Sequence, residues 1–106
     1  MIHLTNMILI YITCKNTKEA KKISKHLLEK KLIACANMHQ IDSTYLWQGK
    51  IEESKETVII AKTKEKNYNK IKKEIKKIHS YKIPCILKIK AKPNQKYNKW
   101  INDELK

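Results

Sequence analysis

The 106-residue chain contains one glycine, two prolines, no arginine and no phenylalanine. A single glycine excludes a glycine-rich phosphate-binding loop, because such loops need several glycines to bring the backbone close to phosphate. No apolar run approaches the ~18 residues needed to cross a bilayer, so no membrane partner is expected. Residues 1–6 lack the basic and apolar regions of a signal peptide. We therefore expect a cytoplasmic protein with a flexible tail at 1–6 and one domain at 7–106.

Arginine is absent, so all 24 basic residues are lysine, and with 10 acidic residues they give a net charge of +14. Lysines that neutralise phosphates can bind nucleic acid. However, arginine makes the bidentate contacts that phosphate and guanine recognition favours. Lysine, isoleucine and asparagine are encoded by codons rich in A and T, so a biased genome explains the excess. We expect a solvated lysine surface and no nucleic-acid partner.

Cysteine is also scarce. Cys14, Cys35 and Cys85 are odd in number, widely spaced and form no CxxC motif, so they do not indicate a disulfide framework or a zinc motif. No nucleophile and base stand together in the sequence, and we do not expect an enzyme.

The apolar residues that are present alternate between strand and helix patterns. Residues 7–13 form an unbroken apolar run, which predicts a central strand buried on both faces. Asn16, with Glu19 three residues later, resembles a capping box at a helix start. After this start, apolar residues recur at helical spacing at Ala20, Ile23, Leu27 and Leu28. A second helical stripe consists of Tyr68, Ile71, Ile75 and Ile78.

Three further strands are predicted at about 33–48, 51–63 and 83–91, and the only glycine, Gly49, marks a hairpin turn between the first two. The resulting order is β-α-β-β-α-β. We therefore predict an α+β, ferredoxin-like fold with two helices on one face of an antiparallel sheet. An extended β-hairpin and a short C-terminal helix near 97–101 complete the prediction.

Four short segments, in this order, give the chain a family resemblance: 32–37 (LIACAN), 47–52 (WQGKIE), 79–84 (HSYKIP) and 97–100 (YNKW). Together they resemble the CutA family of divalent-cation tolerance proteins over about residues 7–105. The resemblance implies a homotrimer whose strands extend each other's sheets, with clefts between subunits. It also implies a response to divalent metal ions through binding of copper or similar ions, without catalysis.

Candidate metal ligands are His79 and Cys85, six residues apart across a helix-to-strand connection, together with Cys14 on the first strand. Imidazole and thiolate suit copper and zinc. The resemblance implies ligands in these regions, but Cys85 stands where the family usually has glutamate and Ile78 where some members have a second histidine. In the alternative interpretation, His79 satisfies a backbone group and Cys85 packs inward with Leu87.

The resemblance further implies that Lys62, Tyr45 and Tyr81 line the family's cleft. Trp47, on the projecting hairpin, is predicted at the trimer interface, the alternative being that it covers its own core. Two other functions stay open: a trimeric signalling-type regulator that holds an anionic small molecule between subunits, and a basic RNA-binding ferredoxin-like domain. No RNP-type stretch or paired strand aromatics support the RNA binder.

Overall fold

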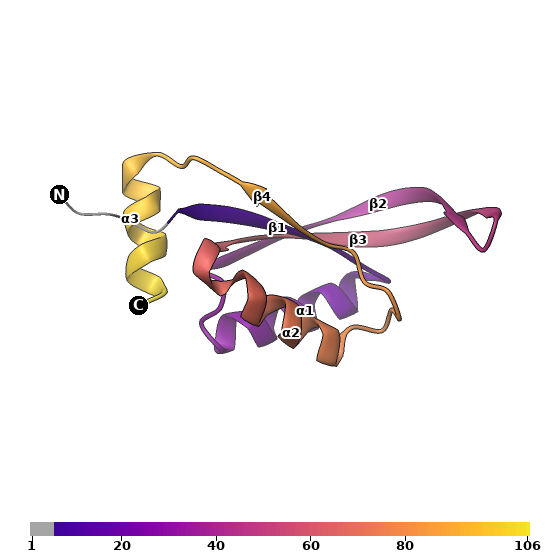
Figure 1. The fold of residues 1–106 in the computed structure, drawn as a ribbon, viewed down its shortest axis with the longest axis horizontal. Helices are drawn as coiled ribbons and strands as arrows, with labels where there is room; N and C mark the ends of the chain where they lie inside the picture. The colour runs from indigo at the N-terminus through magenta and orange to yellow at the C-terminus, as the bar shows by residue number, and fades with distance from the viewer. Residues whose placement is uncertain (1–5) are drawn as a thin grey trace.

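The computed structural model describes residues 6–106, so the predicted tail lies outside the described residues except for Asn6. The elements are β1 (Met7–Cys14), α1 (Thr17–Glu29), β2 (Cys35–Trp47), β3 (Lys50–Lys64), the 3-10 turn η1 (Glu65–Asn67), α2 (Tyr68–Ile78), β4 (Ile86–Lys90) and α3 (Gln95–Glu104). Four antiparallel strands form one sheet in the order β2-β3-β1-β4, with α1 and α2 on one face (Figure 1). The predicted ferredoxin-like fold is confirmed. Among residues 6–106, no helix is both long enough and apolar enough to span a membrane.

The core lies between the sheet and the two helices. Alternate residues of β1 point toward the helices, because successive side chains on a strand lie on opposite faces. Ile8, Ile10 and Ile12 are fully buried there. The helices contribute Ala20, Ile23 and Leu27 from α1 and Ile71 and Ile75 from α2 to the same cluster. Apart from Leu28, which is 39% exposed, the predicted helical stripes are therefore the faces that pack on the sheet.

The opposite face of the sheet, which we call the open face, is apolar and much less covered. Leu9 and Tyr11 of β1 are half-buried there. On β4, Leu87 pairs with Tyr11 and Ile89 pairs with Leu9, and these two side chains are 51% and 45% exposed. The prediction that β1 is buried on both faces is therefore wrong for the open face of this chain.

β4 corrects a second expectation. Ile86 pairs with the buried Ile12 and packs against the helix-side core. Leu87 therefore points the other way, and the alternative in which Cys85 packs inward with Leu87 is wrong. β4 also begins at Ile86 rather than Ile83, because residues 80–85 form bends and irregular chain.

The C-terminal helix covers one end of the open face. Ile101 of α3 and its C-cap residue Leu105 form a second, smaller cluster with Met7, against which Tyr97 packs. The Lys62 ammonium lies 5.4 Å from the centre of the Tyr97 ring. α3 therefore covers the end of the sheet that lies opposite the hairpin formed by β2 and β3 (Figure 1).

At the other end, β2 and β3 run on beyond the sheet as a two-stranded ribbon. β1 pairs with β3 only from Lys64 to Thr57, whereas β2 and β3 stay paired out to Trp47 and Lys50. Gln48 and Gly49 connect them with φ angles of 51° and 79°, the two positive values that a type I′ hairpin turn requires. We call residues 41–56 the arm. It projects from the body of a molecule that measures 53 × 24 × 21 Å (Figure 1).

Glu74 of α2 joins the two helices on their outer side. One carboxylate oxygen contacts His26 Nε2 of α1 at 3.0 Å and Lys30 Nζ at 3.3 Å, and the other accepts from Lys77 Nζ at 2.9 Å. The hydrogen bond from Lys77, followed by those from His26 and Lys30, lowers the pKa of Glu74 from its usual 4.5 to about 2. The negative charge of Glu74 therefore stabilises the folded state.

We predict that Glu74→Gln lowers the free energy of unfolding at pH 7. A carboxylate whose pKa is depressed on folding stabilises the protein above its unfolded pKa, and this contribution is lost as the pH falls through its folded pKa. The difference between variant and wild type should thus shrink between pH 4.5 and pH 2, measured by urea unfolding at matched protein concentration. Glu104→Gln is the control, and a difference that does not change with pH would contradict the assignment.

Candidate functional site

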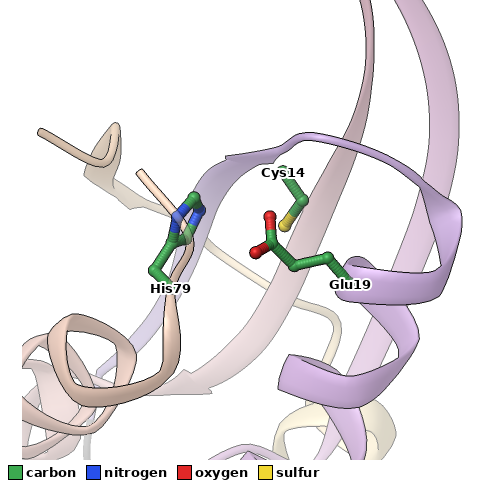
Figure 2. A group of neighbouring side chains, drawn as sticks. All are labelled: Cys14, Glu19 and His79. Carbon is green, nitrogen blue, oxygen red and sulfur yellow. The ribbon is translucent and has the colours of Figure 1, made fainter. Parts of the chain in front are cut away.

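Three ionisable side chains meet where β1 ends, α1 begins and α2 ends. Cys14 is the last residue of β1, Glu19 lies in the first turn of α1, and His79 is the C-cap of α2. The sulfur, a carboxylate oxygen and a ring nitrogen all lie within 4.8 Å of one another (Figure 2). We call these three residues the cluster. Two of its members, Cys14 and His79, are predicted ligands.

Helix capping explains why Glu19 reaches the cluster. The Asn16 side chain accepts the Glu19 N–H at 2.8 Å and fixes the first turn of α1, as the capping pattern predicts. The Glu19 carboxylate then accepts two backbone N–H groups, from Lys15 at 3.0 Å and from Ser80 at 2.9 Å. It therefore ties the start of α1 to the segment that follows α2.

Both ring nitrogens of His79 are also engaged with backbone groups. Nε2 lies 2.8 Å from the Thr13 carbonyl oxygen and must donate to it, whereas Nδ1 accepts the Tyr81 N–H at 3.0 Å. This pattern assigns a neutral ring with its proton on Nε2. His79 therefore fastens the 79–85 segment to the end of β1.

The local environment also controls the charges of the cluster. Burial, reinforced by the nearby Glu19 and Glu56 carboxylates, raises the pKa of the Cys14 thiol to about 12. Burial acts to raise the pKa of Glu19 as well, but hydrogen bonds from Ser80 and Lys15 outweigh it and the net shift is downward. At neutral pH the cluster thus holds a protonated thiol beside a carboxylate.

This arrangement does not fit a resident metal ion. Sulfur, nitrogen and oxygen donors do converge, and such donors suit zinc or copper. However, the imidazole of His79 offers no free lone pair, because Nε2 donates to the Thr13 carbonyl and Nδ1 accepts the Tyr81 N–H. Each ring nitrogen of His79 and each carboxylate oxygen of Glu19 already has a backbone partner. The cluster is a closed polar network that holds three chain segments together.

The third predicted ligand, Cys85, lies outside the cluster in a cleft of about 920 Å³. The arm forms one wall of this cleft through Tyr45, Trp47, Glu52 and Glu56, and the segment 80–85 forms the other wall through Tyr81 and Cys85. The predicted cleft residues Tyr45 and Tyr81 thus lie in one cleft of this chain. Lys62 is not part of its lining and lies beside Tyr97 instead.

Tyr81 connects the two walls. Its hydroxyl donates to Glu56 at 2.7 Å, and its ring lies 4.9 Å from that of His79. Burial, followed by the hydrogen bond to Glu56, raises the pKa of Tyr81 well above its ordinary value, so the phenol stays protonated. The cluster therefore positions the cleft wall through the short chain from His79 to Tyr81.

Two residues contribute to these sites without being predicted as site residues from the sequence. Glu19 was identified only as a capping residue, although a capping carboxylate next to a strand end is a signal that it can reach neighbouring backbone groups. Glu56 carried no local signal, because only the register of β3 and the position of the 79–85 segment bring it to Tyr81.

The fold and site define a class: a small α+β protein with a ferredoxin-like sheet, a long projecting hairpin and a cleft at the base of that hairpin. The model of the family described as CutA1 divalent ion tolerance protein matches residues 8–104. The chain therefore belongs to the CutA1 family, as the four sequence motifs predict.

Individual relatives support this family assignment. The divalent-cation tolerance protein CutA of Pyrococcus horikoshii is 42% identical over 101 residues, which cover 94% of this chain and 99% of that protein. The solved structure of the protein described as periplasmic divalent cation tolerance protein CutA from Archaeoglobus fulgidus has a TM-score of 0.92 at 39% identity, covering 94% of this chain and 99% of that one. CutA1 from Ehrlichia chaffeensis has a TM-score of 0.92 at 37% identity, covering 98% and 99%.

We predict that Glu19→Gln destabilises the protein by about 1.5–3 kcal/mol, the range for a hydrogen bond to a charged group. Glutamine keeps one carbonyl acceptor, whereas the carboxylate serves both Lys15 and Ser80. Urea unfolding at pH 7 measures the loss, and amide hydrogen exchange at Ser80 should accelerate. Glu29→Gln, at an exposed position on the same helix, is the control. Equal stability of the two variants would contradict a role for Glu19 in holding the segments.

Proposed function

We propose that the protein is a homotrimeric CutA-type protein that acts in tolerance to divalent metal ions by binding rather than by catalysis. The observation that carries the assembly is the open face of the sheet, where large apolar side chains are exposed beside an arm that extends past the sheet. The family description names an ion tolerance and no reaction. A protonated Cys14 thiol, with its pKa raised to about 12, also supplies no nucleophile.

The open face supports a partner because its apolar residues are adjacent. Leu9 lies between Ile89 and Lys62, and Tyr11 lies between Leu87 and Ile60 in the paired strands. Contiguous exposed apolar patches mark interaction sites in soluble proteins. Covering this face would remove the exposed area of Leu87 and Ile89 from water, at about 25 cal/mol per Å² of apolar surface.

The arm supports a second copy of this chain as the partner. It carries four acidic residues and two lysines, whereas the remaining chain carries six acidic residues and 22 lysines. The arm also exposes aromatic and aliphatic side chains, including Trp47 at 46% and Leu46 at 75%. An acidic, apolar arm is complementary to the basic, apolar body of another copy. We therefore propose Trp47 at the subunit interface.

The assembly predicts a solution mass of about three times the 12.6 kDa chain at micromolar concentration, measured by light scattering. Leu87→Lys on the open face should dissociate the trimer, because a charge would be buried without a partner. Leu28→Lys, at an exposed position on the helix side, is the matched control and should stay trimeric. A wild-type monomer, or a trimer unaffected by Leu87→Lys, would contradict the proposal.

For the ions, we propose that copper or zinc contacts the protein at Cys85 in the cleft. Among the predicted ligands Cys14, His79 and Cys85, only Cys85 lines the cleft. Cys85 is half-buried, and thiolates favour copper(I) and zinc. Cys14 and His79 would take part only if the cluster exchanged its backbone hydrogen bonds for the ion.

Zinc titration followed by calorimetry shows which of the two thiols, Cys14 or Cys85, binds the ion. We expect Cys14→Ala to bind as many zinc ions per chain as the wild type, because the replaced thiol is buried and does not line the cleft. Cys85→Ala should bind fewer. Loss of zinc binding in Cys14→Ala alone would show that the cluster opens to take the ion, contrary to the proposal.

A further inference from the structure

The outer surface of α1 and α2 is strongly basic. Segments 17–31 and 65–78, which contain the two helices, carry six lysines each, half of the 24 in the chain. Two rows of exposed lysines recur at helical spacing, one on each helix: Lys18, Lys22 and Lys25 on α1, and Lys70, Lys73 and Lys77 on α2. This spacing places each row on one side of its helix, away from the apolar side that packs on the sheet. We call this surface the helix face.

The four acidic residues of the two segments do little to neutralise the helix face. Glu19 is turned into the cluster, and Glu65 forms an ion pair with a lysine of β4 at 3.0 Å. Glu74 is shared by three basic side chains, and the remaining Glu29 is exposed. Within residues 6–106, Lys77 is the one lysine of the two rows that forms an ion pair. The helix face therefore keeps a large positive charge.

Helix stability does not account for this placement of lysines. Like charges three or four residues apart on a helix repel each other and destabilise it. A cation near a helix N-terminus is also unfavourable, because the helix dipole is positive there. Lys18 and Lys70 nevertheless lie in the first turns of α1 and α2, and the first turn of α2 contains no acidic residue. The composition alone favours a solvated surface, but an anionic partner would turn this repulsion into attraction.

The proposed assembly leaves the helix face accessible. The trimer covers the open face, whereas the helices lie on the other side of the sheet (Figure 1). Among the exposed large apolar side chains of residues 6–106, Leu28 alone belongs to α1 or α2, so the apolar arm of another copy has little to pack against there. The apolar sides of both helices are buried in the core, which also disfavours insertion of the helices into a lipid surface.

The helix face offers charge but no free aromatic ring. The ring of Tyr68, on α2, has the ammonium groups of Lys72 and Lys88 at 4.8 and 5.2 Å from its centre. Single-stranded nucleic acids bind largely through stacking of their bases on free rings. A DNA duplex instead presents phosphates on its outside, one charge per about 1.7 Å of axis. Lysines and phosphates can therefore pair without access to the bases.

The separation of the two lysine rows suits the B form of a duplex. The axes of packed helices lie roughly 8–10 Å apart, and lysine side chains that lean outward from them span a somewhat larger distance. The major groove of B-form DNA is about 12 Å wide, so the two rows can reach phosphates on both of its sides. The major groove of A-form RNA is narrow and fits the two rows less well.

We propose that the helix face binds double-stranded DNA through its phosphate backbone, without reading the base sequence. Lysine contacts phosphate as a point charge, so this binding does not need the bidentate fork of arginine. The inference goes beyond the proposed metal-ion function, because it uses neither the cleft nor a thiol. It also differs from the RNA-binding domain considered from the sequence, which would hold RNA on the aromatic residues of its sheet.

Fluorescence anisotropy of a labelled DNA duplex with the whole protein tests the inference. We expect saturable binding that weakens as NaCl rises from about 50 to 200 mM, because bound lysines release counterions from the DNA. The double variant Lys22→Gln, Lys73→Gln removes one charge from each row. It should weaken binding roughly three- to tenfold and lower the slope of log K against log salt by about 2, one for each phosphate contact.

The matched control is the double variant Lys92→Gln, Lys96→Gln. It removes the same charge from exposed positions just before α3 and in its first turn, and it should change the affinity by less than about twofold, because distant charges are screened. Absent saturation would overturn the inference. Equal weakening by the two double variants would also overturn it, because binding would then follow the net charge and not the helix face.

Competition identifies the partner. An RNA duplex, single-stranded DNA and vesicles containing phosphatidylserine should each displace the labelled duplex less effectively than the unlabelled DNA duplex does. Equal or more effective displacement by any of the three would overturn the choice of DNA. Cys85→Ala should leave DNA binding unchanged, so failure of the zinc proposal and failure of this one are distinguishable.

Discussion

The register between β1 and β3 is the constraint on which the rest of the structure depends. Ile10 lies opposite Ala61 on the helix side, and Tyr11 lies opposite Ile60 on the open face. A shift of one residue would exchange these faces and expose the core, because side chains alternate along a strand. The same register that buries the isoleucines of β1 also leaves apolar surface on the open face. Core formation and the proposed contact with a second copy thus have one cause.

The cluster shows why proximity of good ligands does not make a metal site. Cys14, Glu19 and His79 are close enough to share an ion, yet each has a structural task that uses its available atoms. Backbone N–H and carbonyl groups at a strand end and at helix ends lack partners within their own elements. The carboxylate and the imidazole supply those partners, and the thiol fills a buried position. The result is a rigid base for the cleft.

The arm and the body of the molecule differ in charge. The arm is acidic and carries exposed aromatic residues, whereas the body carries most of the lysines. The arm holds four of the ten acidic residues but only two of the 24 lysines. The separation favours contact between the arm and a basic surface.

The sequence by itself determined the order of elements, the capped start of α1, the turn at Gly49 and the family, because these depend on neighbours within a few residues. It also indicated Cys14 and His79 as candidate metal ligands. Only the tertiary structure decided which face of β4 is buried, that Glu19 and not Cys85 joins Cys14 and His79, and that Glu56 meets Tyr81. The physical reason is that strand register and the path of the 79–85 segment result from packing between distant parts of the chain, which no local pattern records.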